Sequence, residues 1–240
     1  MTRTTGTDTA HTAKELLRST TADLAPDPTA NRFVPLVARG AASPAALLVL
    51  ALEQRHVIPA DRRAFEHLVT RSADEPESAA FFSALAAGES LAGDRIGALV
   101  TALGADETVA EAYEPLAGCQ AYPAYVAWLA LNGAPSDTVL ALSANFSAWG
   151  GYCATLAGGL RAHYGLDDAA CGFFDFFATP APDLDRLATE AVRAGLASGR
   201  LTERTARAHG RLLQGYEAMF WDTLAGLRPA DVHDTVSDTV

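Results

Sequence analysis

Residues 216–222 near the end of the chain form the stretch Tyr-Glu-Ala-Met-Phe-Trp-Asp. It belongs to a long helical pattern, in which apolar residues at steps of three and four share one face: Leu213, Tyr216, Phe220 and Leu224. Glu217 has Leu213, Phe220 and Trp221 as helical neighbours. A buried, unpaired carboxylate is costly. We therefore expect Glu217 either to be solvated at the helix edge or to point into a pocket with a partner or a raised pKa.

Composition limits the classes of partner. The chain has 240 residues, of which 49% are hydrophobic, and this is enough for one sizeable core or two small ones. The net charge is −11, whereas a nucleic-acid partner would require a basic face, so we expect no such partner. No apolar run approaches the ~20 residues of a membrane span, and no basic segment precedes an apolar one at the N-terminus. We therefore expect neither membrane association nor a secretory signal.

The cysteines are few and scattered. Cys119, Cys153 and Cys171 form no CxxC motif and no cluster with histidine. An odd, low count does not build a disulfide framework, and a structural zinc site is not indicated. Reduced thiols suit a cytoplasmic protein, which is the location we expect.

Helical patterns follow one another along the middle of the chain. Ser43 and Pro44 begin one helix, which we expect Pro59 to interrupt, and residues 136–137 begin the longest apolar helix. Sustained valine-isoleucine alternation is absent, so no strand is predicted. The sequence predicts a single all-α domain, a helical bundle of about eight or nine helices.

The two ends of the chain are polar. We expect residues 1–30 to form a mostly disordered N-terminal tail with a possible short helix between Thr12 and Leu24, and residues 228–240 to form a flexible C-terminal tail. The helical domain then covers residues 31–227. Within its longest helix, four glycines indicate close approach of another helix or of a ligand: Gly150, Gly151, Gly158 and Gly159.

Few familiar catalytic motifs occur. The sequence contains no GxSxG, P-loop, GxGxxG or HExxH pattern. One ExxH spacing, Glu53 with His56, resembles half of a di-iron site in a helical bundle, and His209 lies eight residues before Glu217. These residues are candidate metal ligands, but the pattern occurs once, and we predict no metal site.

Several polar residues lie on otherwise apolar helical faces. Asn145 precedes Trp149 by four residues, Tyr122 and Tyr125 share one helix, and Gln54 follows an apolar run. Buried amides and phenols need hydrogen-bond partners, which can be one another or a ligand.

The pattern Tyr-Glu-x-x-Phe-Trp at residues 216–221 resembles the C-terminal signature of the TenA/thiaminase II family. That family shares the haem-oxygenase-like fold with the pyrroloquinoline quinone synthase PqqC. Further segments resemble the family in the same order: 31–40, 52–54, 125–129, 136–149 and 173–178. The resemblance covers about residues 31–227. It implies a haem-oxygenase-like bundle that assembles as a homodimer or homotetramer.

Carried over residue by residue, the resemblance implies that Glu217 is the catalytic acid/base and that Tyr125 is the pocket tyrosine. The family's nucleophilic cysteine falls at Asn145, its substrate-binding aspartate at Gln54 and a second tyrosine at Phe177. An amide cannot attack carbon as a thiolate does, so cleavage of thiamine through a cysteine adduct is not expected. Besides Gln54 and Asn145, the residues expected to bind substrate are the pocket walls Trp149, Phe177 and Trp221.

The sequence thus predicts a TenA/PqqC-like small-molecule enzyme without a cofactor. It would act on a nitrogen-containing heteroaromatic metabolite by acid/base chemistry at Glu217, as a hydrolase or a cofactor-free oxidase. Three alternatives stay open: a non-catalytic small-molecule-binding or regulatory protein, a haem-oxygenase-like di-iron oxidase, and a scaffold with no role beyond association.

Overall fold

The computed structural model describes residues 5–27 and 29–227, with side chains from residue 12 onward. This part of the chain contains helices and no strand, which confirms the predicted all-α class. Eight helices have 11 residues or more, while α2 and α5 have six. Their bounds are α1 Thr5–Asp23, α2 Phe33–Ala38, α3 Pro44–Arg71, α4 Pro76–Ala102, α5 Glu107–Ala112, α6 Ala117–Asn132, α7 Pro135–Tyr164, α8 Asp168–Ala178, α9 Pro182–Ser198 and α10 Glu203–Gly226.

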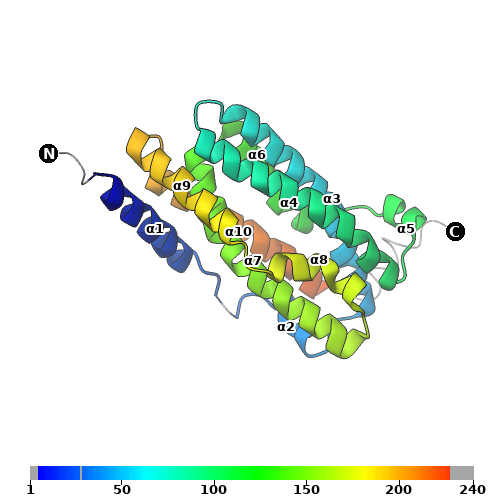
Figure 1. The fold of residues 1–240 in the computed structure, drawn as a ribbon. Helices are drawn as coiled ribbons and strands as arrows, with labels where there is room; N and C mark the ends of the chain where they lie inside the picture. The colour runs from blue at the N-terminus through cyan, green and yellow to red at the C-terminus, as the bar shows by residue number, and fades with distance from the viewer. Residues whose placement is uncertain (1–4, 28, 228–240) are drawn as a thin grey trace.

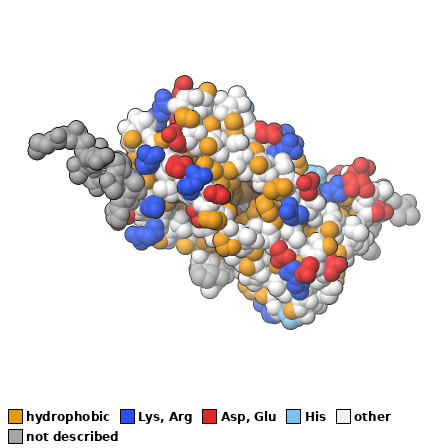
Figure 2. Space-filling model, viewed as in Figure 1, with side chains coloured by type: hydrophobic (Ala, Val, Ile, Leu, Met, Phe, Trp, Pro, Cys, Tyr) orange, Lys and Arg blue, Asp and Glu red, His pale blue; other side chains and the backbone are white. Residues whose placement is uncertain are grey.

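The long helices form a bundle (Figure 1). α3 and α4 lie side by side, and α6 packs against both α3 and α10. α7 packs against α10 and α8, and α1 lies along α9. Charged side chains of both signs are mixed with apolar ones over the face shown in Figure 2. No helix in the described part of the chain has the length and apolarity to cross a membrane.

Two apolar clusters make up the core, and α10 contributes to both. Leu213 belongs to one cluster, whereas Phe220 and Trp221 belong to the other. Glu217 follows Leu213 by one helical turn and precedes Trp221 by one turn. The stretch that carries the sequence signature therefore places a carboxyl group where the two halves of the core meet.

The expectation that Pro59 interrupts a helix is wrong, because α3 runs without a break from Pro44 to Arg71. The helix begins as predicted, with Ser43 Oγ accepting a hydrogen bond from the Ala46 N–H at 3.1 Å. Proline removes one N–H and frees one carbonyl a turn earlier, that of Arg55. Pro59 is exposed, so water can satisfy that carbonyl, while Ile58 and Asp61 on the inner face are buried and hold the helix in register.

The N-terminal segment includes the expected short helix, but α1 already begins at Thr5. Ala13 and Leu16 of this helix are buried. Residues 1–4 and the predicted C-terminal tail, 228–240, lie outside the described residues. The part of residues 1–30 that the structure describes is thus packed onto α7 and α9.

The glycines of α7 differ in their surroundings. A Cβ at Gly159 would lie 2.7 Å from the Val37 carbonyl oxygen and 3.1 Å from the Ala38 Cα, so this glycine allows α2 to approach. At Gly158 and Gly151 a Cβ would meet nothing within 4 Å. Close helix packing, one of the two reasons predicted from the sequence, therefore accounts for Gly159 and not for Gly158 or Gly151.

We predict that Gly159→Ala lowers the free energy of unfolding by about 1–3 kcal/mol, because the backbone of α2 must move away. Its neighbour Gly158 is the control. Gly158→Ala adds a methyl group in open space on the same helix and should be neutral or stabilising by up to about 1 kcal/mol. Urea unfolding followed by circular dichroism measures both. Equal effects of the two substitutions would contradict the packing described for α2 and α7.

Candidate functional site

Glu217 lies on the inner face of α10, with only 8% of its surface exposed. Its Oε2 accepts a hydrogen bond from Asn145 Nδ2 of α7 at 2.6 Å. Its Oε1 accepts one from Trp221 Nε1, one turn further along α10, at 3.2 Å. The structure thus brings together Glu217, Asn145 and Trp221, three of the residues predicted for the site. Of the two alternatives stated for Glu217, solvation at the helix edge is not observed, because the side chain is buried and has hydrogen-bond partners.

Tyr122 of α6 extends this network. Its hydroxyl donates to Asn145 Oδ1 at 2.9 Å. Because the phenol donates, the Asn145 amide must present its oxygen to Tyr122 and its nitrogen to Glu217. Tyr122, Asn145 and Glu217 therefore form one directed hydrogen-bond chain across α6, α7 and α10.

A small cavity of about 20 Å³ lies beside Glu217. The residues that line it come from the segment before α2, from α7 and from α10: Pro26, Ala30, Asn31, Tyr152, Gln214, Glu217, Ala218 and Trp221. The four α10 residues are spaced by three and four positions, so they share one face. Glu217 thus takes part in the hydrogen-bond chain of the core and also lines a cavity.

Burial raises the pKa of Glu217 above its usual value of 4.5, because the charged form loses hydration. The hydrogen bonds from Trp221 and Asn145 oppose this rise, since both stabilise the carboxylate. Burial, and then the nearby Glu217, likewise raise the pKa of the Tyr152 hydroxyl at the cavity. A carboxyl group with a raised pKa can give or take a proton closer to neutral pH than a solvated one.

Two more acidic side chains lie in the interior near Tyr122. Burial raises the pKa of Asp61, on α3, to about 8, and Asp61 Oδ1 has no hydrogen-bond partner among the described residues. Burial, together with the nearby Asp61, raises the pKa of Glu89 on α4. Burial and then Asp61, Glu217 and Glu89 raise the pKa of Tyr122 well above 10.0. Tyr122 therefore stays protonated and acts as a donor at physiological pH.

Aromatic rings surround the indole of Trp221. Trp149 lies 5.9 Å away between ring centroids, and Tyr152 meets the indole edge-on at 5.5 Å. Phe177 of α8 packs edge-on against Trp149 at 5.8 Å. The three aromatic residues predicted as pocket walls therefore lie in one group, although of these only Trp221 lines the 20 Å³ cavity.

Tyr125 is not part of the Glu217 hydrogen-bond chain. Its hydroxyl is 2.8 Å from His209 Nδ1, and its ring stacks on Trp128, whose side chain is 46% exposed. Tyr125 and Tyr122 are three residues apart on α6, and it is Tyr122 that bonds to Asn145. Tyr122 is therefore the α6 tyrosine that bonds to Asn145, and the role of Tyr125 as a pocket tyrosine stays a prediction.

The remaining predicted residues lie on α3 and α10. Gln54 is buried on α3. Glu53 accepts hydrogen bonds from the Tyr113 hydroxyl and the Leu116 N–H, both at 2.6 Å, and from Gln120 Nε2 at 2.5 Å. Both oxygens of Glu53 are thus engaged at the start of α6, a structural role.

The three candidate metal ligands have separate surroundings. The ring of His56 lies 6.1 Å from that of Tyr113, and His209 is paired with Tyr125. Within the described residues, no three histidine, cysteine, aspartate or glutamate side chains are grouped so as to hold a metal ion.

Sequence reasoning missed Asn31, Tyr152 and Gln214 at the cavity and the acidic pair Asp61 and Glu89. Gln214 carried a usable signal, because it precedes Glu217 by three residues and so lies on the same face. Asn31 carried no such signal. It lies in the segment before α2, and only the course of that segment in the folded chain brings it to the cavity.

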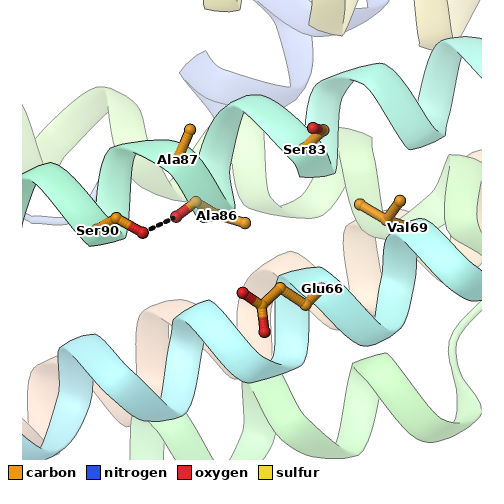
Figure 3. A pocket seen from close by; sticks show the side chains of 6 residues that line it. All are labelled: Glu66, Val69, Ser83, Ala86, Ala87 and Ser90. Atoms are coloured by element: carbon orange, nitrogen blue, oxygen red, sulfur yellow. Dashed lines mark hydrogen bonds between the residues drawn. The ribbon is translucent and has the colours of Figure 1, made fainter.

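A wider groove of about 330 Å³ lies between α3 and α4 and is not the candidate site (Figure 3). Its walls are mainly short side chains, among them Ser83, Ala87 and Ser90. Glu66 is its one titratable lining residue, and this side chain is paired with Arg62 at 2.9 Å. Glu66 is also exposed, so the groove has no buried titratable group comparable to Glu217.

No family model and no curated protein matches the sequence. Among solved structures, the chain is similar to a domain of unknown function with a heme oxygenase-like fold from Shewanella denitrificans OS217. The TM-score is 0.65 with 16% identity, over 91% of this chain and 90% of the other. The protein has a haem-oxygenase-like fold. This confirms the fold that the sequence resemblance implied, whereas membership of the TenA family stays a prediction.

The buried carboxyl groups of this haem-oxygenase-like bundle make its stability depend on pH. The pKa of Asp61 is about 8 in the folded protein against an ordinary 3.8, so the folded state binds this proton more tightly than the unfolded state. The stabilisation is complete below about pH 4 and is lost as pH rises toward 8. Glu89 and Glu217 act with the same sign, because their pKa values are also raised.

We predict that the melting temperature falls between pH 5 and pH 9 and that Asp61→Asn reduces this fall. At pH 8 the variant should be more stable than the unmodified protein by about 1 kcal/mol or more, equivalent to about 2–4 °C. Calorimetry over this pH range measures the effect, with Asp94→Asn on the exposed face of α4 as the control. An unchanged pH dependence in the Asp61 variant would show that Asp61 is ionised in the folded protein.

Proposed function

We propose that the protein is a TenA/PqqC-like small-molecule enzyme that uses Glu217 as its general acid/base. The observation that carries this proposal is a buried carboxyl group with a raised pKa, fixed by Asn145 and Trp221 at the wall of a small cavity. Such a group is suited to proton transfer near neutral pH. The contact between Glu217 and Asn145 also supports the resemblance, because these positions match two residues of the family's catalytic pocket.

The reaction we propose is hydrolysis of a carbon–nitrogen bond at a nitrogen heterocycle. The size of the cavity favours hydrolysis over oxidation, since about 20 Å³ accommodates a water molecule beside the carboxyl group. Ionised Glu217 takes a proton from water, and the water oxygen bonds to the ring carbon. The carbon–nitrogen bond then breaks, and the leaving nitrogen takes the proton from Glu217.

The remaining residues of the network hold Glu217 in position. Asn145 donates to the carboxylate and is itself fixed by Tyr122, so the carboxyl group cannot rotate freely. An aromatic substrate does not fit within the cavity in this conformation. The substrate ring would instead approach from the side on which Ala218 is exposed, and only the reacting atoms would reach Glu217.

We predict that Glu217→Gln lowers kcat about 10²- to 10⁴-fold, because it removes the proton-transfer group while keeping the side-chain shape. The assay is release of ammonia or amine from a panel of nitrogen heteroaromatics that carry an amino substituent on a ring carbon. For the unmodified enzyme, kcat/KM should rise with pH through an apparent pKa above 4.5, as Glu217 becomes ionised.

Glu114→Gln, at an exposed position between α5 and α6, is the control and should leave the rate unchanged. If Glu217→Gln retains full activity on a substrate that the enzyme turns over, the assignment of Glu217 as acid/base is wrong.

A non-catalytic binding protein is the second candidate, and the small volume of the cavity favours it. A panel compound that binds and is recovered unchanged after long incubation would support this role. Assembly as a homodimer or homotetramer and a cytoplasmic location stay predictions from the sequence.

A further inference from the structure

Two residues that line the cavity beside Glu217, Asn31 and Gln214, carry amide N–H donors without a hydrogen-bond partner among the described residues. Asn31 is 7% exposed, and its Oδ1 accepts hydrogen bonds from the Phe33 N–H at 3.1 Å and the Val34 N–H at 3.0 Å. These two bonds at the start of α2 fix which end of the amide is oxygen. Asn31 Nδ2 is therefore left as a buried donor with no hydrogen-bond partner among the described residues.

Gln214 supplies the second donor. Its Nε2 is also buried and has no hydrogen-bond partner in the described part of the chain. Gln214 precedes Glu217 by three residues on α10, so both side chains face the same cavity. Tyr152 also lines the cavity, and its hydroxyl lies close enough to the Asn31 amide for that side chain to oppose the rise in its pKa.

The chemistry of the lining selects the occupant. Leaving a buried N–H unpaired costs roughly 1–3 kcal/mol, so two such donors at one cavity call for an acceptor between them. A cavity needs about 10–15 Å³ to hold a water molecule, and that water needs two to four polar partners. This cavity has a volume of about 20 Å³ and offers two N–H donors, a carboxyl group and a phenol. Water fits both requirements, whereas a larger anion does not fit the volume.

We propose that this cavity is a binding site for one ordered water molecule, which accepts hydrogen bonds from Asn31 Nδ2 and Gln214 Nε2 and donates one to Glu217. The two amides direct the water hydrogens away from themselves and toward the carboxylate. Asn31 and Gln214 are thus positioning residues for the water that Glu217 activates. This role rests on the proposed hydrolytic function, but the presence of the water does not.

The test is a crystal structure at a resolution that shows ordered solvent, determined at neutral pH without substrate. The expected result is one solvent peak at about 2.7–3.2 Å from both Asn31 Nδ2 and Gln214 Nε2. Gln214→Met keeps the length of the side chain and removes the donor, so the peak should be lost from that variant. Arg211→Met, on the exposed face of the same helix, is the matched control and should keep the peak.

A cavity without solvent density, or a peak that bonds to neither amide, would overturn the proposal. Retention of the peak in Gln214→Met would overturn the role of Gln214. These outcomes are independent of turnover. A water in place together with a fully active Glu217→Gln enzyme would refute the acid/base role of Glu217 alone, and a dry cavity in an enzyme that Glu217→Gln inactivates would refute this inference alone.

Discussion

The burial of the Glu217 carboxyl group is the constraint on which the rest of the site depends. A carboxyl group in an apolar interior needs either hydrogen-bond donors for its charged form or a proton that removes the charge. Glu217 accepts two hydrogen bonds, and burial raises its pKa and so favours the protonated form. The donors come from Asn145 on α7 and Trp221 on α10, while Tyr122 on α6 fixes the orientation of Asn145. Three helices are therefore held in one arrangement by a single charge-bearing group at the meeting point of the two core clusters.

The surroundings of Glu217 differ from those of a buried glutamate that has only a structural role. Glu53, in contrast, is a buried glutamate whose oxygens bond to Tyr113, Leu116 and Gln120 and which anchors the start of α6. Glu217 instead borders a cavity that carries unused donors from Asn31 and Gln214. A buried carboxyl group needs no adjoining cavity to stabilise a fold, and the unused donors beside Glu217 are the observation on which the proposed water site rests.

Much of the fold could be predicted from the sequence, because apolar periodicity reports directly on which helical face is buried. Periodicity also identified Glu217, Asn145 and Trp221, whose spacing along their own helices is a local property. Periodicity could not show which of Tyr122 and Tyr125 bonds to Asn145, because the rotation of α6 against α7 decides which hydroxyl reaches that amide. Asn31, Asp61 and Glu89 carry no local signal for the site, because tertiary packing alone brings them near it.

The central claim is that Glu217 can hold a proton in the folded protein at a pH where an exposed glutamate cannot. Infrared difference spectroscopy tests it directly, by comparing the protonated-carboxyl stretching band of the unmodified protein with that of Glu217→Gln during a pH titration. We expect the unmodified protein to show a band that is missing from the variant. This band should disappear as the pH rises, with an apparent pKa above 4.5. A Glu217 signal that titrates at 4.5 or below would contradict it.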